Sequence, residues 1–212
     1  MSEPSAAAPA LRAINGIAGR REITPFQPTG PYPQVMLDLP TGAAIPLSPE
    51  ARGQRIVIEG SVTDGAGQPV ADVMIETWQA DAAGRYAHAS DPDFANADAA
   101  FWGYRRVATD ADGRFTIETV KPGATRAAIE SGAPGVEALH APHLVVAIYG
   151  GGILYRYVTR VYFAGDEANA VDPILQMVPP GRRSTLIMPL DGGVYRCVIR
   201  LQGPGETVFF DL

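Results

Sequence analysis

The sequence has little cysteine, little histidine and few charged residues. Its one cysteine, Cys197, excludes an intrachain disulfide, so a cytoplasmic protein is expected. The net charge of −6 comes without any basic run, which argues against a nucleic-acid partner. No apolar run approaches the length of a membrane span, and the first residues lack the basic and apolar regions of a secretion signal.

Glycine and proline are abundant instead. With 23 glycines and 19 prolines, about a fifth of the 212 residues favour turns and short strands over long helices. The apolar fraction of 46% suits one packed core. Residues 1–22 are rich in Ala, Ser and Pro and have no clear period, so we expect an extended N-terminal arm before a single domain at 23–212.

Short runs of β-branched and aromatic residues predict strands, for example "RIVIEGSVT" (55–63), "HLVVAIYG" (143–150) and "VYRCVIRLQG" (194–203). Asp64-Gly65 predicts a hairpin between 55–63 and the strand at 73–80. Helix is expected only in connectors near 166–170 and 181–184. The prediction is an all-β protein, an antiparallel β-sandwich with long loops and short connector helices.

The three histidines, His88, His140 and His143, form no spaced zinc pair. A histidine at the edge of an apolar strand is more often a hydrogen-bonded core residue than a ligand. By the same reasoning Tyr86, in "AAGRYAH", is ordinary loop packing, and Cys197 is a core residue and not a nucleophile.

Several segments in fixed order carry more information than any residue alone. They are "IETWQADAAGRYAH" (75–88), "WGYRRVATDADGRFTIETVKPG" (102–123), "APHLVV" (141–146) and "TRVYFAGDEANAVDPIL" (159–175). From Thr24 onward the chain resembles the intradiol ring-cleaving dioxygenases, and its tail "LQGPGETVFFDL" resembles that of the family's iron-free α-type subunit in particular.

The resemblance implies a metal site that this chain has lost. Iron-bearing members hold Fe(III) with two tyrosines and two histidines. Tyr86 matches the first tyrosine, and Thr125 stands at or near the second. His143 matches the first histidine, but Val145 stands where the second belongs, and an alkyl group has no lone pair to donate. The resemblance therefore implies no catalytic residue and no bound cofactor on this chain, with Fe(III) held by a homologous β subunit.

The resemblance also implies that such a chain lines the partner's substrate pocket. The segment "PTGPY" supplies Thr29, Gly30, Pro31 and Tyr32 for that wall. Gly151 stands where an arginine that faces the substrate carboxylate is expected, and Arg126, Arg156 or Arg160 are candidates to replace it. The expected substrate is protocatechuate or a catechol with a different ring substituent.

Two other interpretations stay open. The chain could be a stand-alone β-sandwich module for binding or structure, or an iron enzyme with ligands of another kind. Phe209 and Phe210, near the end of the chain, are expected to be covered in part by a partner chain. The number of αβ units, the preferred ring substituent and the role of residues 1–22 are not predicted.

Overall fold

The computed structural model describes residues 46–128, 137–151, 153 and 156–210. The predicted arm at 1–22 and the predicted pocket segment Thr29–Tyr32 lie outside these residues. Among the helices in the described ranges, none is both long and apolar enough to cross a bilayer.

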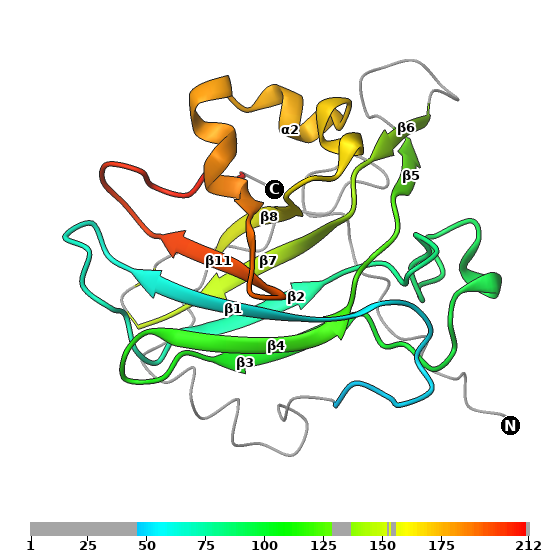
Figure 1. The fold of residues 1–212 in the computed structure, drawn as a ribbon, viewed down its shortest axis with the longest axis horizontal. Coiled ribbons are helices and arrows are strands. Elements are labelled where there is room, and N and C mark those ends of the chain that lie inside the picture. The colour runs from blue at the N-terminus through cyan, green and yellow to red at the C-terminus, as the bar shows by residue number, and fades with distance from the viewer. Residues whose placement is uncertain (1–45, 129–136, 152, 154–155, 211–212) are drawn as a thin grey trace, which may run out of the picture.

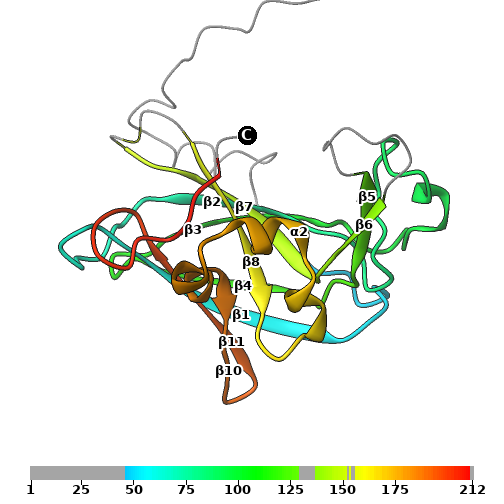
Figure 2. The same ribbon diagram turned by 90° about the horizontal axis from the view of Figure 1, so that it is seen from above.

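Two sheets pack face to face (Figure 1). One sheet has four strands, in the order β10 (Leu190–Asp191), β11 (Val194–Arg200), β1 (Arg55–Thr63) and β4 (Arg114–Val120). The other has five strands, in the order β3 (Tyr104–Ala108), β2 (Met74–Trp78), β7 (His143–Tyr149), β8 (Tyr157–Phe163) and β9 (Ile187–Met188). A separate hairpin, β5 (Thr125–Ala128) with β6 (Glu137–His140), stands at one end of the molecule in Figure 2.

The helices are all short. They are the 3-10 helices η1 (Phe94–Asn96), η2 (Glu167–Ala170) and η3 (Pro180–Leu186) and the α-helix α2 (Pro173–Met177). The segment from η2 to η3 lies beside β8 at the top of Figure 1. Asp172 caps α2, because its carboxylate accepts from the Leu175 N–H and Pro173 occupies the first turn.

The core forms because strand side chains alternate between the two faces of each sheet. The larger cluster lies between the sheets and includes Ile58, Ile75, Ile148 and Ile199. A second cluster lies on the outer face of the five-stranded sheet, where the helical segment packs on Tyr162. The five-stranded sheet is therefore covered on both faces near β8, whereas Val145, Ala147 and Tyr149 on the outer face of β7 are only partly buried.

The predicted β-sandwich is confirmed, with two differences in detail. The pairs β1–β11 and β8–β9 are parallel, so the sheets are mixed. The turn at Asp64-Gly65 forms, and the Asp64 carboxylate accepts from the N–H groups of Ala66 and Gln68. It joins strands of opposite sheets, however, so the predicted hairpin between 55–63 and 73–80 is wrong. Both strands need a buried face, and the chain satisfies both by crossing the core.

The aromatic tail packs in part against its own chain, and the expected cover of Phe209 and Phe210 by a partner chain stays a prediction. The Phe209 ring stacks on Tyr157 with centroids 4.7 Å apart, and the Phe210 N–H donates to the Val158 carbonyl. Both phenylalanines are half-buried. Cys197 is buried in the main core, and burial raises its pKa to about 12, which leaves it a poor nucleophile.

Candidate functional site

The loop that carries Tyr86 is shaped by two aspartates. One carboxylate oxygen of Asp81 accepts hydrogen bonds from the N–H groups of Ala83 and Arg85. The other oxygen accepts a hydrogen bond from the N–H of Asp98. Asp91 accepts from the N–H of Tyr86 itself. Such side-chain-to-backbone bonds let a loop without regular structure hold one conformation. The Tyr86 backbone is thereby fixed on both sides.

This loop is pressed against the segment that leads to Thr125. A Cβ added at Gly84 would come within 2.0 Å of the Ala124 carbonyl oxygen, and Gly84 has a φ of +79°. The Gly123 N–H donates to the Asp81 carbonyl over 2.9 Å. Only a glycine tolerates both this backbone angle and this approach. The two positions matched to the family's tyrosine ligands, Tyr86 and Thr125, therefore lie on segments that are bound to each other.

The histidine positions lie on the outer face of the five-stranded sheet. In the antiparallel pairing of β7 with β8, His143 is opposite Tyr162 and Val145 is opposite Arg160. Residues opposite each other share a face, as do residues two apart along a strand. His143, Val145, Arg160 and Tyr162 therefore point to the same side. On the other neighbour of β7, Trp78 is opposite Val145.

Tyr86 reaches this face through aromatic contacts. Its ring stacks on Trp78 with centroids 5.8 Å apart, and Trp78 meets Trp102 edge-on at 6.2 Å. Burial raises the pKa of Tyr86, the positive charge of Arg160 lowers it, and the negative charge of Asp91 raises it further. Burial is the largest of these effects, so Tyr86 carries its proton at neutral pH.

His143 is 3% exposed, and its Nδ1 lies 2.7 Å from the Ala141 carbonyl oxygen. Burial, followed by the charge of Arg160, lowers the pKa of His143 to about 4. The imidazole is therefore neutral at physiological pH. Because a carbonyl only accepts, Nδ1 carries the proton and only Nε2 retains a lone pair.

Arg160 is the cation of this cluster. Its Nη1 lies 3.3 Å from Nδ1 of His140, which in turn lies 3.6 Å from Oδ2 of Asp172. A guanidinium only donates, so the shorter contact requires Nδ1 of His140 to accept. A protonated Nδ1 would donate to Asp172 instead, so the imidazole tautomer decides between the two partners.

The negative charge of Asp172 balances the positive charge of Arg160, and the Asp172 side chain is fully buried, at 0% exposure. It accepts from the N–H groups of Ala141 and Leu175 and from the Tyr162 hydroxyl, at 2.9, 2.7 and 3.1 Å. Burial by itself would raise the pKa of Asp172. The contact with His140 and these three hydrogen bonds outweigh it and hold the pKa at about 2. Asp172 is therefore ionised over the whole physiological range.

The described residues of this cluster do not fit a ferric ion. Tyr86 and His143 offer one oxygen and one nitrogen, while Val145 offers no donor. Arg160, on the neighbouring strand, lies opposite Val145, so a cationic residue borders the position where the resemblance implies a ligand. Within the described ranges, no three His, Cys, Asp or Glu side chains gather in a way that could hold a metal ion. A cation beside Tyr86 and His143 would be repelled, not bound.

Gly151, the fifth substrate position predicted from the sequence, lies elsewhere. It is exposed and follows the end of β7, whereas His143 begins that strand. At about 3.3 Å per residue, seven strand residues separate the two by roughly 20 Å or more. Arg126 and Arg156 are exposed, and Arg160 is committed to the cluster.

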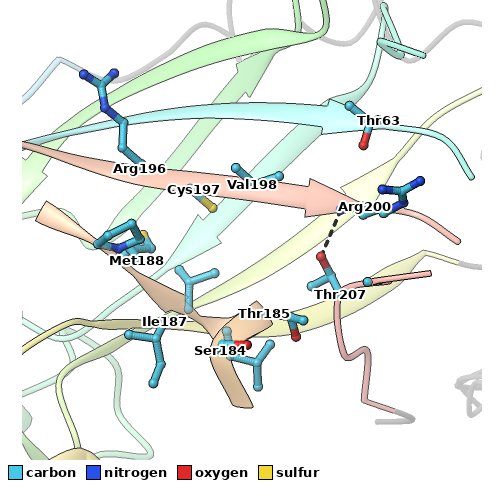
Figure 3. Close-up of a pocket in the computed structure, with 14 residues that line it drawn as sticks. Thr63, Ser184, Thr185, Ile187, Met188, Arg196, Cys197, Val198, Arg200 and Thr207 are labelled. Carbon is cyan, nitrogen blue, oxygen red and sulfur yellow. Dashed lines mark hydrogen bonds between the residues drawn. The ribbon is translucent and has the colours of Figure 1, made fainter. Parts of the chain in front are cut away.

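A cavity of about 340 Å³ opens at the edge of the sandwich, between β11 and the segment from η3 to β9 (Figure 3). It borders Cys197 and Val161, which belong to the main core, so it lies on the opposite side of β8 from Arg160. Arg196 is paired with Glu59 and Asp191, and Arg200 donates to the carbonyls of Gly65 and Gln202. This cavity is therefore separate from the Tyr86–His143 cluster.

Fold and cluster together define a β-sandwich protein with a tyrosine–histidine–arginine cluster on the outer face of one sheet. A family model described as "Dioxygenase" matches residues 23–197. The protocatechuate 3,4-dioxygenase alpha chain of Burkholderia cepacia is 42% identical, with 89% of this chain and 97% of the relative covered. The alpha chain of Pseudomonas putida is 40% identical, with 89% and 96% covered. The chain therefore belongs to this dioxygenase family, a family of oxidoreductases.

Two further matches bear on the partner and the fold. The protocatechuate 3,4-dioxygenase beta chain of Burkholderia cepacia is 41% identical, with 65% of this chain and 57% of the relative covered. The solved 3-chlorocatechol 1,2-dioxygenase of Rhodococcus opacus 1CP superposes with a TM-score of 0.54 at 27% identity, with 74% of this chain and 62% of that structure covered. The predicted family and fold are thus confirmed.

The close approach at Gly84 generates a first prediction. Gly84→Ala should lower the free energy of unfolding by about 3 kcal/mol or more, because a left-handed φ costs about 1–2 kcal/mol and the carbonyl contact adds to it. Gly67→Ala is the matched control: Gly67 has a φ of +80° with nothing within 4 Å of an added Cβ. Urea denaturation of both variants measures the difference, and equal losses would contradict the contact.

Asp172 generates a second prediction. Its folded pKa of about 2 lies below the ordinary value near 3.8, so its contribution is present above pH 4 and lost as the pH falls toward 2. Asp172→Asn should cost about 2 kcal/mol at neutral pH and progressively less below pH 4. Asp112→Asn, in an exposed turn, should change little. Denaturation across this pH range tests it; a loss that stays constant with pH would refute the assignment.

Proposed function

We propose that this chain is the iron-free α-type subunit of an intradiol catechol dioxygenase of the protocatechuate 3,4-dioxygenase type. A homologous β subunit would hold Fe(III) and carry out ring cleavage, in which both atoms of O2 are inserted between the two hydroxyl-bearing carbons. The observation that carries the proposal is the pairing of Val145 with Arg160, where the resemblance places the second histidine ligand.

The comparisons support the subunit assignment over a stand-alone module. Two relatives that are named as alpha chains are matched over nearly their whole length. A chain named as beta is similar to the same sequence, so the two kinds of subunit share an ancestor with this one. The contacts between the Tyr86 and Thr125 segments also support the proposal, because they give this surface one defined shape that a partner can recognise.

The proposed contribution of this chain is a wall of the partner's substrate pocket. Thr29, Gly30, Pro31 and Tyr32 would supply it, since a glycine lets the backbone approach a flat ring, a proline stiffens the loop and a tyrosine offers an aromatic face. Gly151 would lie at the same pocket. Its exposed position, far from His143, suits a contact with another subunit's site better than with this chain's own cluster.

A subunit that holds the substrate ring in place and keeps water out of its partner's active site contributes to the reaction rate. The substrate would be protocatechuate or a related 4-substituted catechol that forms a cis,cis-muconate. Residues 1–22 are proposed as an arm that wraps the partner. The cytoplasmic location expected from the single cysteine stays a prediction.

Co-expression with the β subunit tests the subunit assignment. The two chains should co-purify as a coloured complex with one iron per αβ pair, because only the β subunit has a full ligand set. The chain expressed alone should contain iron at background level. Metal analysis and visible absorption of both samples measure this, and stoichiometric iron in the chain alone would refute the proposal.

A substitution at Gly151 tests whether this chain forms a wall of the partner's substrate pocket. Gly151→Arg in the αβ complex should raise the kcat/KM ratio of protocatechuate over unsubstituted catechol by about tenfold or more, since one charge-assisted hydrogen bond to a carboxylate is worth about 1.5–3 kcal/mol. The matched control is Gly181→Arg, at an exposed glycine with open space around it. A ratio that moves equally in both variants, or in neither, would place Gly151 away from the substrate.

A further inference from the structure

The degenerate cluster contains a positive charge that a simple loss of ligands does not require. Loss of two donors would leave a pocket filled by alkyl groups, as Val145 fills its own position. The neighbouring strand instead places Arg160 directly opposite Val145. Opposite residues in an antiparallel pair have Cβ atoms about 5 Å apart, so the side chain of Arg160 leaves its strand beside the position of the missing ligand.

The guanidinium is held there by the surrounding residues. Nη1 of Arg160 contacts Nδ1 of His140 at 3.3 Å, and His140 is 7% exposed. Oδ2 of the Asp172 carboxylate lies 3.6 Å from the same ring nitrogen. Asp172 is anchored by two backbone N–H groups and by Tyr162, which faces His143 across the strand pair. A carboxylate and a guanidinium thus meet at one imidazole nitrogen, and the charge of Arg160 is compensated by that of Asp172 nearby.

The same charge reaches both surviving ligand positions. It acts on Tyr86 from the loop side and on His143 from the strand side. A metal ion bound by these two residues would be repelled by the same positive charge, because Arg160 already disfavours a proton on each of them.

We propose that Arg160 is an internal cation that replaces the metal in this cluster and excludes metal ions from it, independently of the missing donors. The inference rests on the proposed iron-free role. It predicts that a donor restored at position 145 is insufficient while Arg160 remains.

The test uses Zn²⁺ alone as the probe, because zinc binds imidazole nitrogens and His143 with a histidine at position 145 would give two of them beside Tyr86. The variants are Val145→His, Arg160→Gln, and the two combined, each in the full chain. Where the chain does not stay in solution alone, it is co-purified with the β subunit, and the metal of a parallel unaltered complex is subtracted. Zinc titration calorimetry gives the affinity.

The expected result is that the combined variant binds one zinc per chain at least about a hundredfold more tightly than Val145→His or Arg160→Gln alone. Equal affinity in Val145→His and the combined variant would overturn the proposal, because the guanidinium would then exclude nothing. Failure of the combined variant to bind would overturn it as well, provided that its circular dichroism and melting temperature show a folded chain. Arg160→Met with Val145→His is a second way to remove the charge if the glutamine variant does not fold.

These outcomes are separate from those of the subunit assignment. Iron in the unaltered chain alone would refute the iron-free role. Tight zinc binding by Val145→His would refute only the role of Arg160 and leave the subunit assignment standing.

Discussion

The register between β7 and β8 determines most of what the cluster can do. Side chains alternate along a strand, and an antiparallel partner places its own side chains directly opposite. One register therefore puts His143, Val145, Arg160 and Tyr162 on one face while Leu144, Val146 and Val161 enter the core. A slip by one residue would expose the core residues and bury the arginine on the wrong side. The core thus fixes the position of the charge.

The scaffold around the cluster is specified by a few residues. The Tyr86 loop packs on the Gly123 segment through a contact that only glycine allows, and Asp81 organises the loop with three backbone bonds. Such contacts are easily broken by a single substitution, so the shape of this surface depends on these few positions.

The sequence predicted the sandwich, the strand at 194–203 and the burial of Cys197, because these depend on alternation and on ordered motifs. It did not predict the hairpin partners, since Asp64-Gly65 has the same local chemistry whether the chain turns within a sheet or crosses to the other. His140, Asp172 and Arg160 were not predicted as one cluster. Their contacts depend on the pairing of strands and on the packing of α2 against them, which join residues far apart in the sequence. The "DP" pair at 172–173 did carry a signal for a helix cap that could have been used.

The place of β11 has a consequence for how the protein is made. This strand lies between β10 and β1, and it pairs with β1 across most of the length of the chain. During synthesis the four-stranded sheet therefore stays open until β11 has left the ribosome, with the edge of β1 exposed. A product that terminates before β11 would present an unpaired strand edge to whatever lies nearby.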